Sequence, residues 1–179
     1  MLSVGDTFPA FDLKATVSSH LSSAFVRITD QDHAGKWKVF FFWPKDFTFI
    51  CPTEIAAFGS LHENFSRANA VVLGGSTDSE FVHLACRHQH PQLVNLPLPM
   101  LSDIKRELSQ ALGIIDKREG VAQRATFIVD PEGIIRYAAV TDTSVGRNAH
   151  EVLRVLEALQ TGELCPAGWQ KGSDALKVA

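Results

Sequence analysis

The chain has 179 residues, of which 45% are hydrophobic and 21% are charged, a composition typical of one globular domain with a sizeable core. Its formal net charge is −3 and its basic residues are scattered, so we expect neither a nucleic-acid partner nor an anionic membrane partner. The N-terminus lacks the basic and apolar segments of a secretory signal, and no apolar run is long enough to cross a bilayer. We therefore expect a cytoplasmic protein, whose cysteines are more often catalytic, redox-active or metal-binding than structural.

The first predicted elements surround one apolar run. A weak strand pattern covers residues 25–29, and the continuous apolar run at residues 39–43 predicts a central strand buried on both faces. After a loop over residues 44–50, apolar residues recur at steps of three and four, which predicts an amphipathic helix. The residues of this stripe are Ile55, Phe58, Leu61, His62 and Phe65.

The middle of the chain predicts a second strand and two helices. Residues 70–75 are typical of a buried strand, and the polar residues 76–79 supply caps for a helix that runs to about His90. A short strand is expected over residues 98–101. A helix over residues 103–112 should follow, ended by the next glycine.

The C-terminal third predicts a hairpin and a last helix. Residues 125–129 and 134–140 are typical of two strands joined by a tight turn, and residues 148–159 form an amphipathic helical pattern. Strands that alternate with helices and then form a hairpin indicate an α/β fold, with a central mixed sheet flanked by helices.

The end of the chain differs from the rest in composition. Residues 161–179 contain too much glycine and proline for a helix, yet are too aromatic for a plain disordered tail. We expect this segment to pack against other protein surface, a second subunit included. The chain is thus divided into a domain over residues 1–160 and a C-terminal tail over residues 161–179.

Three cysteines, Cys51, Cys86 and Cys165, are present, and none belongs to a C-x-x-C motif, so neither a thioredoxin-type dithiol nor a zinc ribbon is predicted. Cys51 stands between a loop and a helix start, with Pro52 at the first helical position. Backbone N–H groups and the positive end of the helix dipole favour a thiolate there. Nucleophilic cysteine chemistry, such as attack on the O–O bond of a peroxide, requires this, because the thiolate is reactive and the neutral thiol hardly is.

A free cysteine is more often a small buried hydrophobic residue than a nucleophile. That interpretation fits Cys51 poorly, because it follows the carboxyl end of a predicted strand, where open α/β sheets place their sites. Thr48 can offer its hydroxyl to the thiolate or to a peroxide oxygen. Pro44 can shield the site from water without adding an N–H donor.

His83, Cys86 and His90 fall on one face of a predicted helix, which raises the question of a metal site. Zinc normally takes three or four protein ligands, and no fourth candidate is nearby in the sequence. We therefore predict no metal, and a surface or half-buried helix face at these positions.

Residues 44–54, with the sequence PKDFTFICPTE, match the P-x-x-x-T-x-x-C motif of peroxiredoxins in the extended form of typical two-cysteine members. Among these the chain most closely resembles the bacterial alkyl hydroperoxide reductase C proteins. The resemblance runs nearly end to end, through residues 4–6, 127–131 and 163–169. It implies a thioredoxin-like fold and the reduction of hydrogen peroxide and organic hydroperoxides to water and alcohols.

The resemblance also implies roles for particular residues. It implies that Cys51 is the peroxidatic cysteine, which is oxidised to a sulfenic acid. It also implies that Cys165 is the resolving cysteine, which forms an intersubunit disulfide with Cys51. The separation of the two cysteines in the sequence, taken alone, fits either an intramolecular or an intermolecular bond. Arg124 matches the active-site arginine of the family, although the residues alone suggest a solvated loop arginine. Arg147 matches a second arginine that supports the pocket, with Glu54 between the two.

The implied enzyme needs no metal or organic cofactor and serves antioxidant defence and redox homeostasis. Its electrons would come from thioredoxin, a flavoprotein disulfide reductase or a small disulfide carrier, and its homodimers would assemble into a ring. Two alternatives stay open: a holdase role for such rings, and a general disulfide oxidoreductase, which the missing C-x-x-C disfavours. Cys86 replaces a tryptophan usual in similar sequences, so local packing should differ, and the third thiol is a candidate off-pathway partner.

Overall fold

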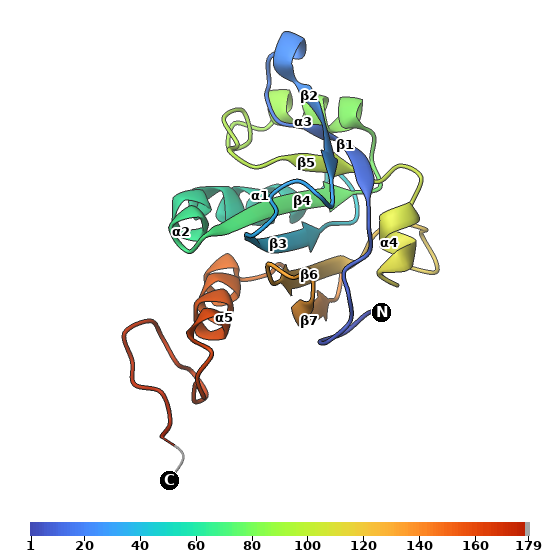
Figure 1. Cartoon of the computed structure of the whole chain (residues 1–179). Helices are drawn as coiled ribbons and strands as arrows, with labels where there is room; N and C mark the ends of the chain where they lie inside the picture. Colours follow the sequence, from blue (N-terminus) through green and yellow to red (C-terminus); the bar gives the residue numbers. More distant parts are fainter. Residues whose placement is uncertain (178–179) are drawn as a thin grey trace.

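The computed structural model describes residues 1–177, which form one mixed seven-stranded sheet with helices packed against it (Figure 1). The strands are β1 (Asp12–Thr16), β2 (Phe25–Thr29), β3 (Trp37–Phe42), β4 (Ala70–Ser76), β5 (Met100–Ser102), β6 (Arg124–Val129) and β7 (Ile135–Thr141). The helices are α1 (Cys51–Ser60), α2 (His62–Arg67), α3 (Glu80–Gln89), α4 (Glu107–Ala111) and α5 (Ala149–Thr161), with a 3₁₀ turn at Leu21–Ser23.

The strand order is β2-β1-β5-β4-β3-β6-β7. The pairs β3–β4 and β4–β5 are parallel, and the other four pairs are antiparallel, which confirms the predicted mixed sheet. The weak strand pattern at residues 25–29 and the hairpin of β6 and β7 are also confirmed. β1 was not predicted; it lies between β2 and β5.

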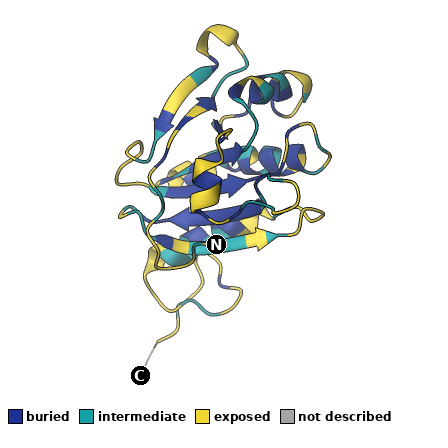
Figure 2. Ribbon diagram, turned by 90° about the vertical axis from the view of Figure 1, so that its right-hand side faces the viewer, coloured by how far each residue is buried: buried dark blue, intermediate teal, exposed yellow. Residues whose placement is uncertain are grey.

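β3 is the predicted central strand, and its side chains divide the core in two. Val39 and Phe41 belong to the apolar cluster that contains residues of α1, α2, α3 and α5. Phe40 and Phe42 belong to the cluster on the other face, which α4 and the N-terminal segment cover. Figure 2 shows the resulting buried centre of the sheet. A strand buried on both faces needs no polar alternation, which is why its sequence is continuously apolar.

The helix predicted after Cys51 is present, but it consists of two segments, α1 and α2, that meet at Leu61. The hydroxyl of Ser60 donates to Ala57 O at 2.8 Å, and Leu61 N donates to Phe58 O at 3.2 Å. The serine thus bonds the carbonyl that a continuous helix would use, which interrupts the helix. The apolar stripe predicted for this helix is buried, with the exception of His62, which is half-buried.

The helix predicted over residues 103–112 is shorter than expected, because α4 begins only at Glu107. Arg106 has a left-handed backbone with φ of 63°, which no helix interior allows. Asp103 still caps the helix, since its carboxylate accepts from Leu108 N at 3.2 Å and Ser109 N at 2.7 Å. Gly113, with φ of 70°, ends the helical segment as predicted.

The C-terminal tail leaves the domain after α5 and runs away from the sheet, largely exposed (Figures 1 and 2). Its main contact is Trp169, which is 6% exposed and whose backbone carbonyl accepts from Arg154 Nη1 of α5 at 2.8 Å. The last two residues of the predicted tail lie outside the described range, and the division at residue 160 stays a prediction. No helix within residues 1–177 is long and apolar enough to cross a membrane.

Candidate active site

Cys51 is the first residue of α1, at the end of the loop that follows β3. Cys51 is 1% exposed, and Pro52 is the second residue of the helix, one position later than we expected. The N–H groups of Thr53 and Glu54 both donate to Ile50 O, at 3.0 and 3.3 Å. These two backbone donors are therefore already paired, and the hydrogen bonds to the sulfur that the structure shows within residues 1–177 come from side chains.

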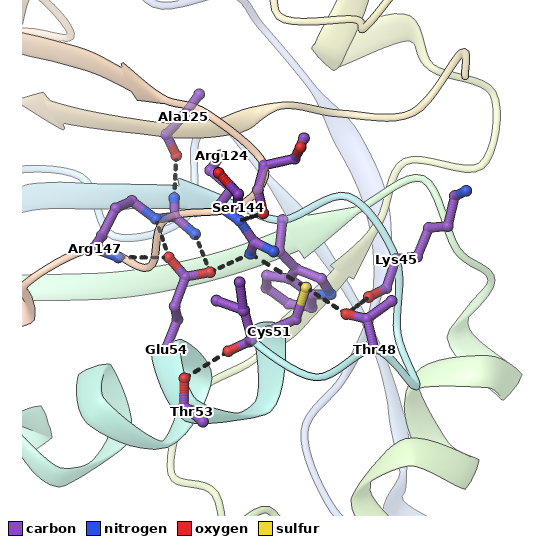
Figure 3. A network of polar contacts seen from close by, with 12 residues as sticks. Lys45, Thr48, Cys51, Thr53, Glu54, Arg124, Ala125, Ser144 and Arg147 are labelled. Atoms are coloured by element: carbon purple, nitrogen blue, oxygen red, sulfur yellow. Dashed lines mark hydrogen bonds and ion pairs between the residues drawn. The ribbon is translucent and has the colours of Figure 1, made fainter. Parts of the chain in front are cut away.

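Two side chains donate to the sulfur (Figure 3). The hydroxyl of Thr48 lies 2.9 Å from Cys51 Sγ, and Nη1 of Arg124 lies 3.3 Å from it. The Thr48 hydroxyl is also 3.1 Å from Lys45 O, and it has one proton for these two acceptors. Because hydrogen bonds to ionised acceptors are the stronger ones, a thiolate would draw that proton to the sulfur.

Glu54 lies between two buried arginines, as the resemblance implied (Figure 3). Its Oε2 is 2.5 Å from Arg124 Nη1 and 3.1 Å from Arg147 Nη2, and its Oε1 accepts from Arg147 Nε at 2.7 Å. Both arginines also bond the backbone: Arg124 Nε donates to Thr143 O and Arg147 Nη1 to Ala125 O. All three charged side chains are thus fixed by several hydrogen bonds each.

The charges of this cluster are nearly balanced. Two guanidinium groups and one carboxylate leave one net positive charge beside the sulfur, in a site where the three side chains are 6% exposed or less. A buried charge is stable only next to an opposite one. The cluster is therefore arranged to hold one further anion, and the sulfur of Cys51 is the group in contact with it.

An open cleft of about 910 Å³ is lined by Pro44, Thr48 and Arg124 among others, and the last two of these residues contact Cys51 Sγ. Pro44 lacks an N–H group, so it borders the cleft without a competing donor, as expected. Lys45 and Glu119, which the sequence did not single out, form an ion pair between the two loops at this cleft.

Arg124 corrects the interpretation drawn from the residues alone. It is not a solvated loop arginine, because it is the first residue of β6 and only 3% exposed. The family motif was the only signal in the sequence that pointed to it. The local pattern is uninformative here, since the partners Cys51 and Glu54 are 73 and 70 positions away in the chain.

Cys165 lies apart from Cys51 within one chain. It is half-buried after α5, where its sulfur is 3.4 Å from Thr161 Oγ1 and 3.8 Å from Ala158 O. None of these contacts is shared with Cys51, and all three cysteines are free thiols. The structure therefore does not bring the two sulfurs together in the single chain.

The face of α3 that carries His83 and Cys86 is not the surface or half-buried face that we expected. His83 is fully buried and Cys86 is 2% exposed, since α3 packs against the sheet. Burial, with a smaller effect of the Asp46 carboxylate, raises the pKa of Cys86 to about 11. No three potential ligands converge as a metal site anywhere in residues 1–177.

An α/β domain whose central strand leads to a buried, arginine-paired cysteine belongs to the class of thiol-based redox proteins. Comparison with known proteins defines it further. The model of the AhpC/TSA family matches residues 4–138. The alkyl hydroperoxide reductase C of Mycolicibacterium smegmatis is 53% identical over 186 residues, which cover 99% of this chain and 95% of that protein.

Solved structures give the same result. Mycobacterium tuberculosis AhpC has a TM-score of 0.87 and 54% identity, over 95% of this chain and 99% of that one. A reduced Plasmodium vivax 2-Cys peroxiredoxin has a TM-score of 0.90 and 32% identity, over 99% and 94% of the two chains. The chain therefore belongs to the AhpC/TSA family of peroxiredoxins and has their thioredoxin-like fold. As a member it is a thiol peroxidase that reduces peroxides.

Proposed function

We propose that Cys51 is the peroxidatic cysteine of this peroxidase. Its thiolate attacks one oxygen of the peroxide, the O–O bond breaks, and the products are a Cys51 sulfenic acid and water or an alcohol. The observation that supports this role is the pair of donors on the sulfur, Thr48 at 2.9 Å and Arg124 at 3.3 Å. The same donors can stabilise the charge that develops on the leaving oxygen.

In the second step Cys165 of a partner subunit attacks the sulfenic acid, which releases water and forms an intersubunit Cys51–Cys165 disulfide. This assignment is supported by the free, half-buried thiol of Cys165 in a tail whose residues are mostly exposed. A disulfide needs the two Cα atoms within roughly 7 Å. Because Cys51 is 1% exposed, the first turn of α1 must unwind and the tail must loosen before the sulfurs can bond.

A separate dithiol then reduces the disulfide and completes the cycle. Thioredoxin, a flavoprotein disulfide reductase or a small disulfide carrier would serve, in the cytoplasm, where such reductants operate. The substrates in this proposal are hydrogen peroxide and organic hydroperoxides, which would reach the sulfur from the open cleft that Thr48 and Arg124 line. The homodimer required by the intersubunit disulfide would assemble further into a ring of dimers.

Peroxide consumption tests the role of Cys51. The wild-type protein, supplied with a thioredoxin system, should consume hydrogen peroxide and cumene hydroperoxide, whereas Cys51→Ser should consume neither, because a hydroxyl of very high pKa cannot replace a thiolate. Circular dichroism of both proteins controls for folding. Turnover by a folded Cys51→Ser protein would refute the assignment.

A further inference from the structure

A buried polar cluster lies behind the loop that carries Thr48, and the chemistry described so far does not use it. Asp46 of this loop has a fully buried side chain, as has His83 of α3. Asp46 Oδ1 accepts from Trp43 Nε1 at 2.7 Å, and its Oδ2 is 2.7 Å from His83 Nδ1. The Asp46 carboxylate thus links Trp43, which directly follows β3, to His83 of α3.

The hydrogen-bond partners of His83 define where its protons are. Its Nε2 lies 3.1 Å from Leu101 O, and a carbonyl oxygen can only accept, so Nε2 carries a proton. Its Nδ1 faces a carboxylate oxygen, so a second proton lies between Nδ1 and Asp46 Oδ2. The pair is therefore neutral as a unit and can be buried without a further counter-ion.

The backbone of Asp46 is fixed as well as its side chain. Its N–H group donates to Asp78 Oδ2 at 2.9 Å, and that oxygen also accepts from Ser76 Oγ at 2.7 Å. Ser102 Oγ donates to Asp78 O at 2.8 Å. The loop is therefore fastened at Asp46 to the ends of β4 and β5 and to the start of α3.

Beyond Asp46 the loop has few contacts of its own. Phe47 takes a left-handed backbone with φ of 57° and is 53% exposed, and Phe49 is 98% exposed. A phenylalanine holds such a conformation only when its surroundings impose it. Thr48 lies between these two residues and two positions after Asp46, so a displacement of Asp46 would be expected to move the Thr48 hydroxyl.

We propose that Asp46 and His83 are positioning residues of the peroxide step, which act by holding the Thr48 hydroxyl on Cys51 Sγ. Neither touches the sulfur or the cleft that receives the peroxide. This inference rests on the proposed function, in which the Cys51 thiolate attacks the peroxide. The anchor keeps the donor in place before each turnover, so that little reorganisation is needed when the sulfur reacts.

Asp46→Ala tests the anchor, with the rate of peroxide attack on the reduced protein measured by rapid mixing. We expect a decrease of about 10- to 100-fold, the scale of a catalytic donor displaced by about 1 Å. His83→Ala should change the rate in the same direction. Asp46→Asn should keep the rate within about threefold, because its amide can accept from Trp43 and donate to the Nδ1 of a neutral His83.

Arg87→Met is the matched control for lost stability. Arg87 is on the same helix and 1% exposed, but its guanidinium bonds the carbonyls of Thr16, Leu96 and Leu98 and not the loop. This variant should lose stability and keep the rate of peroxide attack. A folded Asp46→Ala protein with the wild-type rate, or an equal loss of rate in Arg87→Met, would overturn the proposal.

A double-mutant cycle with Thr48→Ala separates positioning from a general structural effect. If Asp46 acts through Thr48, then Asp46→Ala should slow the Thr48→Ala protein by less than about threefold, since the hydroxyl is already absent. If Asp46→Ala slows the Thr48→Ala protein as much as it slows the wild type, Asp46 does not act through Thr48 and the proposal is refuted. The proposal is also refuted if the rate of Asp46→Asn is as low as that of Asp46→Ala. A failure of the proposed function itself is recognised separately, by activity in Cys51→Ser.

Discussion

The Nη1 atom of Arg124 lies 2.5 Å from Oε2 of Glu54, and the same nitrogen lies 3.3 Å from the sulfur of Cys51. The carboxylate therefore fixes the guanidinium at the place where it meets the reacting atom. A flexible surface arginine would lose rotamer entropy each time it bound the sulfur, whereas this one is already ordered. We therefore expect replacement of Arg124 to change the rate of peroxide attack and replacement of Glu54 to change the stability of the folded protein.

Replacing Arg124 by methionine should slow peroxide attack by several orders of magnitude, because the positive partner of the thiolate and the stabilisation of the leaving oxygen are lost together. Rapid-mixing kinetics of the reduced variant measure this rate. Arg136→Met is a suitable control, since Arg136 pairs with Asp130 and its side chain is 46% exposed. An unchanged second-order rate in Arg124→Met would reduce Arg124 to a structural role.

Glu54→Gln should cost about 3–5 kcal/mol of the free energy of unfolding, because two buried guanidinium groups lose the anion that they share. Urea denaturation of the two proteins measures the difference. The control is Glu63→Gln, which removes a carboxylate that is 79% exposed and pairs with the exposed Arg67. It should change the free energy of unfolding by less than about 1 kcal/mol. Equal losses in the two variants would contradict the special place of Glu54.

Peroxide treatment should convert the protein to a covalent dimer on non-reducing gels, and Cys165→Ser should remove that band while Cys51 is still oxidised once. The reason is that Cys165 is the accessible thiol outside the site, after α5. Mass spectrometry of the Cys51 peptide checks the single oxidation. A band that survives Cys165→Ser and disappears in Cys86→Ser would identify Cys86 as the resolving residue.

Cys86 should react slowly with iodoacetamide in the folded protein at pH 8, since its pKa is raised to about 11 and its side chain is buried. Cys165 provides the accessible comparison, and denaturation should make the two equally reactive. Modification of Cys86 as fast as that of Cys165 in the folded state would contradict its burial.

The same shift predicts a loss of stability in alkali. The unfolded chain ionises Cys86 near its usual pKa of 9.0, whereas the folded chain keeps the proton until about 11. Between these values the native state binds more protons than the unfolded state, so the contribution of Cys86 makes the free energy of unfolding fall as pH rises. Cys86→Ala should remove this part of the pH dependence in urea titrations at pH 8–11.

Much of the local structure could be predicted from the sequence. The apolar run of β3, the helix start at Cys51, the hairpin of β6 and β7 and the helix that begins after Asn148 depend on caps, turns and periodicity that act over a few residues. Together with the motif at residues 44–54, these features were enough to name the family and a candidate nucleophile. The prediction of one continuous helix after Cys51 failed, because the side-chain hydrogen bond of Ser60 interrupts the helix between α1 and α2.

Only the tertiary structure decided how the site is held. The residues that contact one another in the site are far apart in the sequence, so no periodic pattern relates them. The separation is 93 positions for Arg147 and Glu54, 73 positions for Arg124 and Cys51, and 37 positions for His83 and Asp46. These contacts exist because β3 and β6 pair antiparallel, and because α1 and α3 both pack on the sheet to which these two strands belong. The sequence pointed to the residues that we propose to carry the chemistry, and the packing of distant elements determined which of them are buried, paired and in contact with the sulfur.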